Sequence, residues 1–324
     1  MVTVALSGAT SGFGLTVLRT FAANPGPHTL VLLSRTPQPE WTAKGVDVRP
    51  VDYTSRTSLV QALQGVHTVL SMIGASPEAM RDSQLALVAA AKEAGVRRFA
   101  PSEYVGAGGG YRDIDLYAGK GEVWEAVKAS GMQYTRFACG IFMSIFATGT
   151  PKPVTEVGRA EGAESGEEEA LAGLRPWSFM FNMLRGTADL PGDGSAKFAV
   201  TDTRDVARFV IAALDLDVWP AELGMRGSLL SFDEAVAIVG RVQGRKFLVR
   251  ENSVAELEAG CEVPEKRFYN QVRLALVNEW GVVGDDLNRA FPDIRPVTVE
   301  DFVEKWWSGV EVGEPSWGKD QSFM

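Results

Sequence analysis

The N-terminal segment constrains the fold of this chain more than any other part of it. An apolar run at residues 2–6 predicts a strand, and the helical pattern that follows predicts a helix over Gly12–Ala23. The turn between them contains Gly8, Gly12 and Gly14. In α/β proteins such a turn lets a phosphate group approach the free backbone amides at the start of the helix. The segment therefore predicts a nucleotide site, the alternative being a turn that only packs helix on strand.

Strand and helix patterns alternate through the first half of the chain, which predicts an α/β fold with a doubly wound, Rossmann-like parallel sheet. The further strands are expected at residues 29–34, 46–51, 68–73, 97–101 and 133–138, and the further helices at 55–63, 78–94 and 114–130. We expect residues 1–150 and about 196–218 to form the nucleotide-binding domain. Residues of about 151–195 and 219–308 should form a smaller substrate-binding part, and 309–324 a loose tail.

The second half of the chain is less regular. A strand is expected at residues 197–201 and a helix at 203–214, with further helices at 231–243 and 265–278. Residues 158–173 are acidic and almost free of large apolar side chains, so we expect an exposed loop there, with one short helix within it or a lid over the site as alternatives.

Composition excludes several function classes. The net charge is −9 and no block of Lys and Arg occurs, which argues against a nucleic-acid partner. The chain has two cysteines (Cys139 and Cys261) and two histidines (His28 and His67), too few and too scattered for a zinc site or a histidine-based hydrolase triad. No apolar run approaches the about 20 residues that span a bilayer. We expect a cytoplasmic protein without a metal or membrane partner, either a monomer or a homodimer.

The end of the second expected strand bears on the choice of cofactor. Ser34 and Arg35 stand where such sheets meet the adenosine ribose, and no carboxylate is present there. An arginine offers a planar set of donors to a 2'-phosphate, whereas a carboxylate would repel it. The sequence therefore favours NADP(H) over NAD(H), with a solvated surface arginine as the alternative interpretation.

Further cofactor contacts are expected at the carboxyl ends of the third and fourth strands. Asp52 can accept a hydrogen bond from the adenine amino group or cap the following helix. Ile73 and Gly74 let the backbone lie against the cofactor. The complete set of expected cofactor-binding residues is Gly8, Thr10, Ser11, Gly12, Phe13, Gly14, Ser34, Arg35, Asp52, Ile73, Gly74 and Lys120.

Tyr117 and Lys120 are the candidate catalytic residues. They lie three positions apart in an expected helix and can share one of its faces. A lysine beside the nicotinamide ribose can hold the ribose hydroxyls and supply a proton to the substrate. An ordinary surface lysine is the alternative.

Several stretches, taken in order, resemble the NmrA-like and isoflavone reductase-like family of atypical short-chain dehydrogenases. Residues 97–104 (Arg-Arg-Phe-Ala-Pro-Ser-Glu-Tyr) are especially similar to the family's fifth-strand motif. The other stretches are residues 8–14, 51–53, 69–74, 190–194, 202–207 and 291–294. The resemblance implies that Lys120 contacts the nicotinamide ribose and assists proton transfer. Ser11 replaces the middle glycine of the family's turn, and Leu116 occupies the position of the tyrosine of ordinary short-chain dehydrogenases, which leaves the role of Tyr117 open.

The resulting hypothesis is an NADPH-dependent reductase that transfers hydride to a C=C, C=O or C=N bond of a small, largely apolar molecule. The candidate pocket residues are Tyr104, Phe142, Phe146, Trp177, Met180 and Phe181, with plain core packing as the alternative for each. Two rival hypotheses stay open. One is a non-catalytic, NADP-binding redox sensor that acts through a protein partner, and the other is an ordinary short-chain alcohol dehydrogenase that uses Tyr117.

Overall fold

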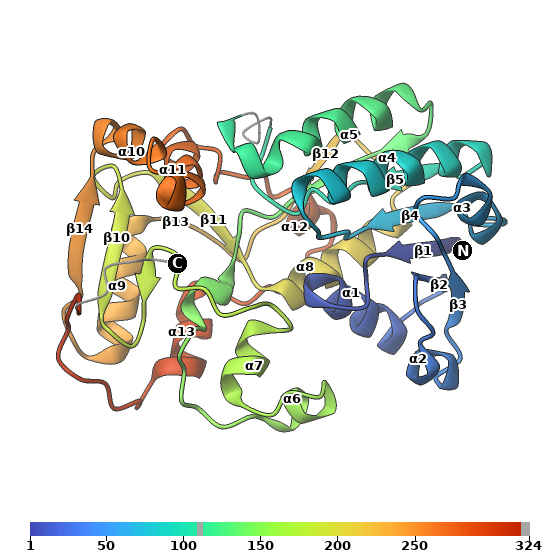
Figure 1. Cartoon of the computed structure of the whole chain (residues 1–324). Coiled ribbons are helices and arrows are strands. Elements are labelled where there is room, and N and C mark those ends of the chain that lie inside the picture. Colours follow the sequence, from blue (N-terminus) through green and yellow to red (C-terminus); the bar gives the residue numbers. More distant parts are fainter. Residues whose placement is uncertain (109–112, 319–324) are drawn as a thin grey trace.

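A parallel six-stranded sheet forms the centre of the first part of the molecule (Figure 1). The computed structural model describes residues 1–108 and 113–318. The strands of this sheet run in the order β3-β2-β1-β4-β5-β6. Their bounds are β1 Thr3–Ser7, β2 Thr29–Ser34, β3 Asp47–Pro50, β4 Thr68–Ser71, β5 Arg98–Ala100 and β6 Gln133–Tyr134. This order confirms the predicted doubly wound sheet, in which the N-terminal strand is central.

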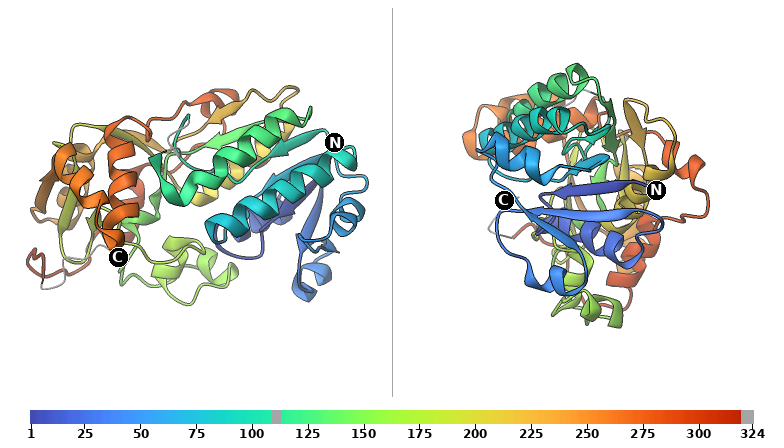
Figure 2. Two further views of the ribbon diagram at one scale, coloured as in Figure 1. Left: turned by 45° about the horizontal axis from the view of Figure 1, so that its top comes forward. Right: turned by 90° about the vertical axis from the view of Figure 1, so that its right-hand side faces the viewer.

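Helices cover both faces of the sheet because successive strand residues point to opposite sides. Leu6 of β1 packs toward α1 (Gly12–Ala23) and α8 (Thr203–Ala212), whereas its neighbour Ala5 packs toward the opposite layer. The opposite layer consists of α3 Arg56–Ala62, α4 Pro77–Glu93 and α5 Ala118–Ala129. The short helix α2 (Pro39–Ala43) lies between β2 and β3 in the chain, and the 3-10 turn η2 (Asp115–Tyr117) leads into α5. The two views of Figure 2 show these layers from other sides.

The second part contains two small sheets and its own hydrophobic core. One sheet has the order β14-β10-β9 and the other β13-β11-β8. The strands are β8 Ile141–Phe142, β9 Phe181–Asn182, β10 Thr187–Pro191, β11 Lys197–Thr201, β13 Ser228–Ser231 and β14 Leu248–Asn252. The helices are α9 Phe232–Gln243, α10 Val254–Cys261, α11 Pro264–Val277 and α13 Val299–Trp307, whereas Leu287 of α12 (Asp286–Ala290) packs in the core of the first part. Large aromatic side chains such as Phe198, Phe232 and Trp307 fill the core of this part.

The chain passes between the two parts more often than the expected boundaries imply. The expected strand 133–138 is divided into β6 and a separate strand β7 (Arg136–Ala138). β7 pairs with β12 (Glu222–Gly224), which comes from the stretch expected to belong to the substrate-binding part. Conversely, β8 and β11 both come from stretches expected in the nucleotide-binding domain (1–150 and about 196–218), but they pair with each other in a small sheet that also contains β13. The 3-10 turns η3 (Met143–Phe146) and η4 (Ala213–Asp215) follow β8 and α8.

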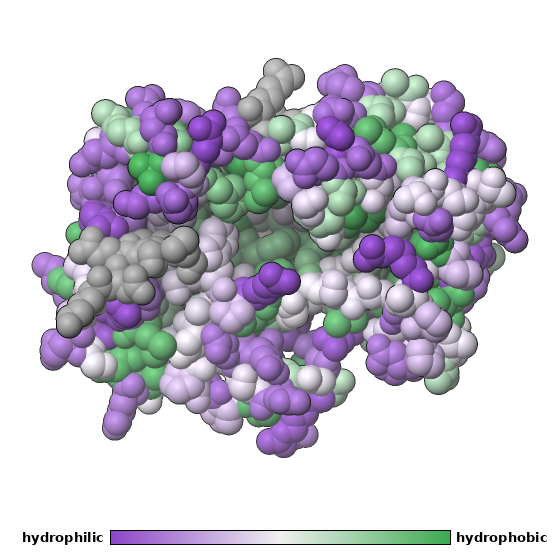
Figure 3. Space-filling model, in the orientation of Figure 1, coloured by the Kyte–Doolittle hydropathy of each residue, from purple (hydrophilic) through white to green (hydrophobic). Residues whose placement is uncertain are grey.

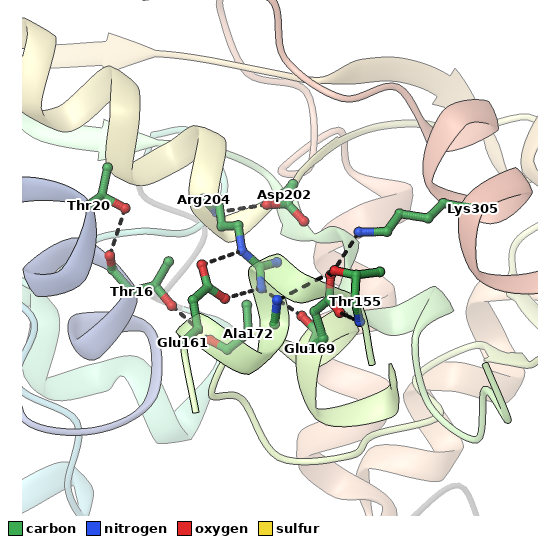
Figure 4. A network of polar contacts seen from close by, with 10 residues as sticks. Thr16, Thr20, Thr155, Glu161, Glu169, Ala172, Asp202, Arg204 and Lys305 are labelled. Atoms are coloured by element: carbon green, nitrogen blue, oxygen red, sulfur yellow. Dashed lines mark hydrogen bonds and ion pairs between the residues drawn. The ribbon is translucent and has the colours of Figure 1, made fainter. Parts of the chain in front are cut away.

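The acidic segment differs from the exposed loop that its composition suggests. It forms two short helices, α6 (Glu156–Ala160) and α7 (Gly166–Leu171), and Glu169 within it is only 1% exposed. The Glu169 carboxylate accepts hydrogen bonds from Thr155 and from Lys305 on α13 (Figure 4). Arg204 on α8 binds the carboxylate of Glu161 in the same network. Polar contacts therefore fix a segment that has few apolar residues to bury.

The described end of the expected loose tail also makes contacts. The backbone amide of Ser316 donates to the carbonyl of Arg185, and the Arg185 guanidinium donates to the carbonyl of Trp317. Residues 309–318 have no helix or strand, and residues 319–324 lie outside the described part of the chain.

Candidate functional site

A cavity of about 660 Å³ opens at the carboxyl ends of β1, β2 and β4. This is the point at which the strand order reverses, because β2 lies on one side of β1 and β4 on the other. Open α/β sheets bind their ligands at this point. The lining includes Gly8, Thr10, Ser11, Gly12, Phe13, Gly14, Ser34, Arg35, Ile73, Gly74, Ser102, Tyr104, Lys120 and Phe142. The face of the molecule seen in Figure 3 is hollowed between its two parts, with apolar surface inside the hollow.

The glycine turn forms one wall of the cavity, and its shape requires glycine. Gly8 has φ +73°, and a Cβ added to it would lie 2.6 Å from the backbone nitrogen of Ile73. A Cβ on Gly14 would lie 2.3 Å from the carbonyl oxygen of Gly8. A Cβ on Gly12, by contrast, would meet nothing within 4 Å. The first amides of α1 have no partner within the helix, so this turn can receive an anion.

Ser34, the last residue of β2, and Arg35, which follows it, both line the cavity at the end where the adenosine ribose is expected. Arg35 is exposed and lines the cavity, and Ser34 accepts a hydrogen bond from the side-chain amide of Gln38 at 3.2 Å. Tyr53, which the sequence interpretation passed over, also lines the cavity and shares a 2.6 Å hydrogen bond with the Ser7 hydroxyl. Burial raises the pKa of the Tyr53 phenol, so this group stays protonated at neutral pH.

Asp52 does not cap the following helix, because the N-cap of α3 is Ser55. Its carboxylate accepts hydrogen bonds from the backbone amide and the hydroxyl of Thr54, at 2.9 and 2.7 Å. A strand-end aspartate followed by threonine two positions later is typical of such local turns. Asp52 is absent from the cavity lining, and its contact with adenine stays a prediction.

Lys120 reaches the cavity from the first turn of α5. Its side chain is 8% exposed, and its ammonium group donates a hydrogen bond to the carbonyl oxygen of Ser102. The ammonium nitrogen also lies 5.2 Å from the centroid of the Tyr117 ring. A carbonyl oxygen and an aromatic face are both common partners of a lysine side chain, and here they fix its direction.

Tyr117 belongs to η2 and is absent from the cavity lining. Burial, together with the nearby carboxyl of Glu103, raises the pKa of its phenol to about 12. Its ring packs against Phe268 at 6.0 Å and Trp280 at 6.3 Å between centroids. The structure therefore brings the Tyr117 ring to Lys120 without placing the phenol at the wall of the cavity.

Of the six expected pocket residues, two line the cavity, three are buried in the core of the second part, and Trp177 does neither. Tyr104 and Phe142 line the cavity and pack around Phe13, at 4.7 and 5.2 Å between ring centroids. Phe146, Met180 and Phe181 are fully buried in the core of the second part, where Phe146 and Phe181 pack at 4.9 Å. Trp177 stacks on Phe179 at 4.3 Å and is absent from the cavity lining. Core packing, the alternative interpretation, describes the three buried residues, because apolar periodicity cannot separate a pocket wall from an interior.

Two further features of the described part of the chain concern a metal site and a membrane-spanning helix. Among residues 1–108 and 113–318, no group of three or more His, Cys, Asp or Glu side chains is arranged to hold a metal ion. No helix in the described part of the chain is both long and apolar enough to cross a membrane.

Comparisons with known proteins agree with this geometry. The model of the NmrA-like family matches residues 2–267. An oxidoreductase of Botryotinia fuckeliana is 29% identical over 315 residues, covering 91% of this chain and 96% of that protein. The phenylcoumaran benzylic ether reductase TP7 of Nicotiana tabacum is 24% identical over 291 residues, covering 80% and 81%. The complex of leucoanthocyanidin reductase with NADPH from Vitis vinifera superposes with a TM-score of 0.70 at 18% identity, covering 94% of this chain and 99% of that one.

Proposed function

Because this chain belongs to the NmrA-like family, and is an oxidoreductase of the isoflavone reductase-like kind, we propose that it reduces a small, largely apolar metabolite with NADPH. The bond reduced is a C=C, C=O or C=N bond. The observation that carries the proposal is the placement of a buried lysine, Lys120, in the same cavity as the glycine turn. A buried ammonium group there can supply a proton to a substrate, which a redox sensor does not need.

The residues of the cavity fit NADPH. Gly8 and Gly14 let the turn pack tightly against the backbone of Ile73 and Ala9, whereas a Cβ on Gly12 would project into open space at the start of α1, where a pyrophosphate would lie. Arg35 lines the end of the cavity next to β2, where a 2'-phosphate would lie. Leucoanthocyanidin reductase, which has the same fold, was solved with NADPH bound.

NADPH supplies the hydride when bound, and the chain supplies orientation and a proton. Hydride transfer leaves negative charge on the substrate, and an ammonium group beside that charge stabilises it or donates the proton. We assign this role to Lys120, whose ammonium group donates one hydrogen bond to the carbonyl oxygen of Ser102. An ammonium group has three hydrogens, so two are left for ribose hydroxyls and substrate.

Tyr104, Phe13 and Phe142 give the cavity an apolar aromatic wall. Such a wall excludes water and accepts a flat, apolar substrate better than a charged one. The low dielectric also strengthens the attraction between Lys120 and the negative charge that develops on the substrate.

The proposal is tested by NADPH oxidation in the presence of an isoflavone, which carries a C=C bond conjugated to a C=O bond and is the compound class named in isoflavone reductase, a protein of similar fold. We compare the wild type with Lys120→Ala and Tyr117→Phe. We expect turnover to fall only in the lysine variant, because the tyrosine phenol is outside the cavity lining. Unchanged turnover in the lysine variant would contradict the proposed role of Lys120. Tight NADPH binding, read from nicotinamide fluorescence, together with no turnover of any compound would favour the redox-sensor hypothesis.

A further inference from the structure

We propose that Gln84, a buried residue of α4, is a positioning residue that holds Lys120 in place through the backbone of Ser102. The inference rests on the proposed function for the role of Lys120, but the geometry that carries it is independent of any substrate. It involves Gln84, the turn at Pro101–Ser102–Glu103 and the ammonium group of Lys120.

Gln84 makes two hydrogen bonds in the interior of the molecule. It is 1% exposed, and its Oε1 accepts a hydrogen bond of 2.7 Å from the backbone amide of Ser102. Its Nε2 donates to the sulfur of Met80, one helical turn earlier, at 2.9 Å. Sulfur is a weak acceptor, so the bond to Ser102 is the stronger of the two. Burying an amide costs free energy unless its bonds are made, and Gln84 makes its better bond to the residue that holds Lys120.

The backbone at Ser102 forms a tight turn that directs the Ser102 carbonyl oxygen toward the ammonium group of Lys120. The amide of Glu103 donates to the carbonyl oxygen of Pro101 at 2.8 Å, which makes Ser102 the central residue of a three-residue turn. The Ser102–Glu103 peptide group is thereby held by its N–H on one side, and its C=O accepts the hydrogen bond from Lys120 on the other. The backbone amide of Ser102 donates to Gln84, so the N-terminal side of Ser102 is also fixed.

A buried carboxyl group, that of Glu103, lies near Lys120 and offers it a second possible partner. The carboxyl of Glu103 is buried, and its Oε2 has no hydrogen-bond partner among the described residues. Arg136, which interacts electrostatically with this carboxyl, is held by Glu222 and the carbonyl of Gly108. Without the Ser102 carbonyl as an acceptor, Lys120 is free to turn toward the Glu103 carboxyl and away from the cavity.

A labelling experiment tests the positioning without any substrate. The full-length protein is treated with acetic anhydride at pH 8, and the acetylation of Lys120 is measured by mass spectrometry relative to Lys128 at the other end of α5. The variants are Gln84→Met, which keeps the side-chain length and removes the amide, and Gln84→Glu, which keeps an acceptor oxygen for Ser102. Met80→Leu is the matched control, because it removes only the sulfur contact of the same glutamine.

We expect the Lys120-to-Lys128 labelling ratio to fall several-fold in Gln84→Met, because a lysine turned toward the buried Glu103 carboxyl is shielded from the reagent, and to stay within twofold of wild type in Gln84→Glu and Met80→Leu. A ratio in Gln84→Met equal to or above that of wild type overturns the inference, whatever happens to activity. So does an equal fall in Gln84→Met and Met80→Leu, because that result means altered packing of α4.

Kinetics with a turned-over substrate then separate this inference from the proposed function. We expect Gln84→Met to lower kcat about tenfold with NADPH affinity within about twofold, since small misplacements of a catalytic group are costly. In a Lys120→Ala background the same change should have no further effect on kcat. If Lys120→Ala keeps full turnover, the proposed function fails while the labelling result stands. If Lys120→Ala loses turnover and Gln84→Met does not, the positioning role fails alone.

Discussion

The hydroxyl of Thr16 on α1 donates a 2.8 Å hydrogen bond to the carbonyl oxygen of Ala172, which lies 156 positions later in the chain. The next residue, Gly173, has φ +84°, and a Cβ there would lie 3.1 Å from the carbonyl oxygen of Gly12 (Figure 4 shows the contact at Thr16). The acidic segment is therefore attached to the helix whose first turn forms the expected phosphate site. Arg204 strengthens the attachment by donating to the carbonyl of Glu169 as well as to the carboxylate of Glu161.

Glu169→Gln should destabilise the protein in a pH-dependent way. Burial would raise the pKa of this carboxyl, but the hydrogen bonds from Thr155 and Lys305 outweigh it and hold the pKa below its usual value of 4.5. A depressed pKa contributes stability above the unfolded-state pKa, and this stability is lost as pH falls through the folded-state pKa. We expect a loss of about 2 kcal/mol at pH 7. Urea unfolding at pH 7 and below pH 4 measures the difference, which should shrink at the lower pH.

Glu156→Gln is the matched control for this prediction, because Glu156 lies in the same segment with 88% of its side chain exposed. Exposed ion pairs contribute little, so its unfolding curve should match that of wild type at both pH values. An equal loss in the two variants would mean that the segment responds to net charge and not to the buried network.

Arg35→Asp should separate NADPH from NADH. The guanidinium lines the cavity beside β2, and the introduced carboxylate would repel a 2'-phosphate while accepting a hydrogen bond from a free 2'-hydroxyl. One charge-assisted hydrogen bond is worth roughly 1.5–3 kcal/mol, so NADPH affinity should fall about tenfold or more. Fluorescence titration with both cofactors provides the measurement. Equal losses for NADPH and NADH would refute the assignment, and Arg56→Asp, an exposed arginine that pairs with Glu93, should change neither.

Phe142→Ala and Phe146→Ala should have different effects although the two residues are four positions apart. Phe146 is fully buried, and its truncation should cost about 3–5 kcal/mol of unfolding free energy. Phe142 is half-buried at the cavity wall, so its truncation should cost less stability and change KM for the substrate. Denaturant unfolding and steady-state kinetics on both variants check this, and a change in KM from Phe146→Ala at unchanged stability would contradict it.

Gly8→Ala should mainly lower the stability of the fold, whereas Gly12→Ala should mainly abolish NADPH binding. A Cβ on Gly8 collides with the backbone of Ile73, and with the positive φ this should cost about 2–4 kcal/mol of stability. A Cβ on Gly12 meets no atom within 4 Å, so only the strain at φ +54° applies, about 1–2 kcal/mol. That methyl group would stand at the start of α1, and NADPH binding should be lost with the fold intact. Thermal unfolding with NADPH titration tests the pair, and retained binding in Gly12→Ala would place the pyrophosphate elsewhere.

The central sheet could be predicted because each strand carries its own local signal. The expected bounds of α1 and β2 agree with the structure, since apolar runs and capping positions define them within a few residues. The division of 133–138 into β6 and β7 could not be predicted, because it depends on β12 pairing with Arg136–Ala138 from far along the chain. The burial of Glu169 likewise could not be predicted, because its partners Thr155 and Lys305 are not linked to it by any helix or strand periodicity in the sequence.

The candidate site was predictable where it follows strand ends and unpredictable where it depends on side-chain direction. Gly8 and Arg35 line the cavity because each directly follows a parallel strand, and Lys120 reaches it from the first turn of α5. Met180 and Phe181 lie in an aromatic stretch that looks the same in a pocket wall and in a core. Gln84 reads as an ordinary helix residue, and only its bond to Ser102 gives it significance.

The exchange of strands between the two parts has a consequence for how this protein can be altered. β8 belongs to the sheet of the second part although it precedes that part in the chain, and β12 returns to lie beside β7. Neither part is a contiguous module, so a different substrate region cannot be grafted on by joining two fragments at one point. New specificity in such a chain has to arise by replacing side chains around the cavity within an intact scaffold.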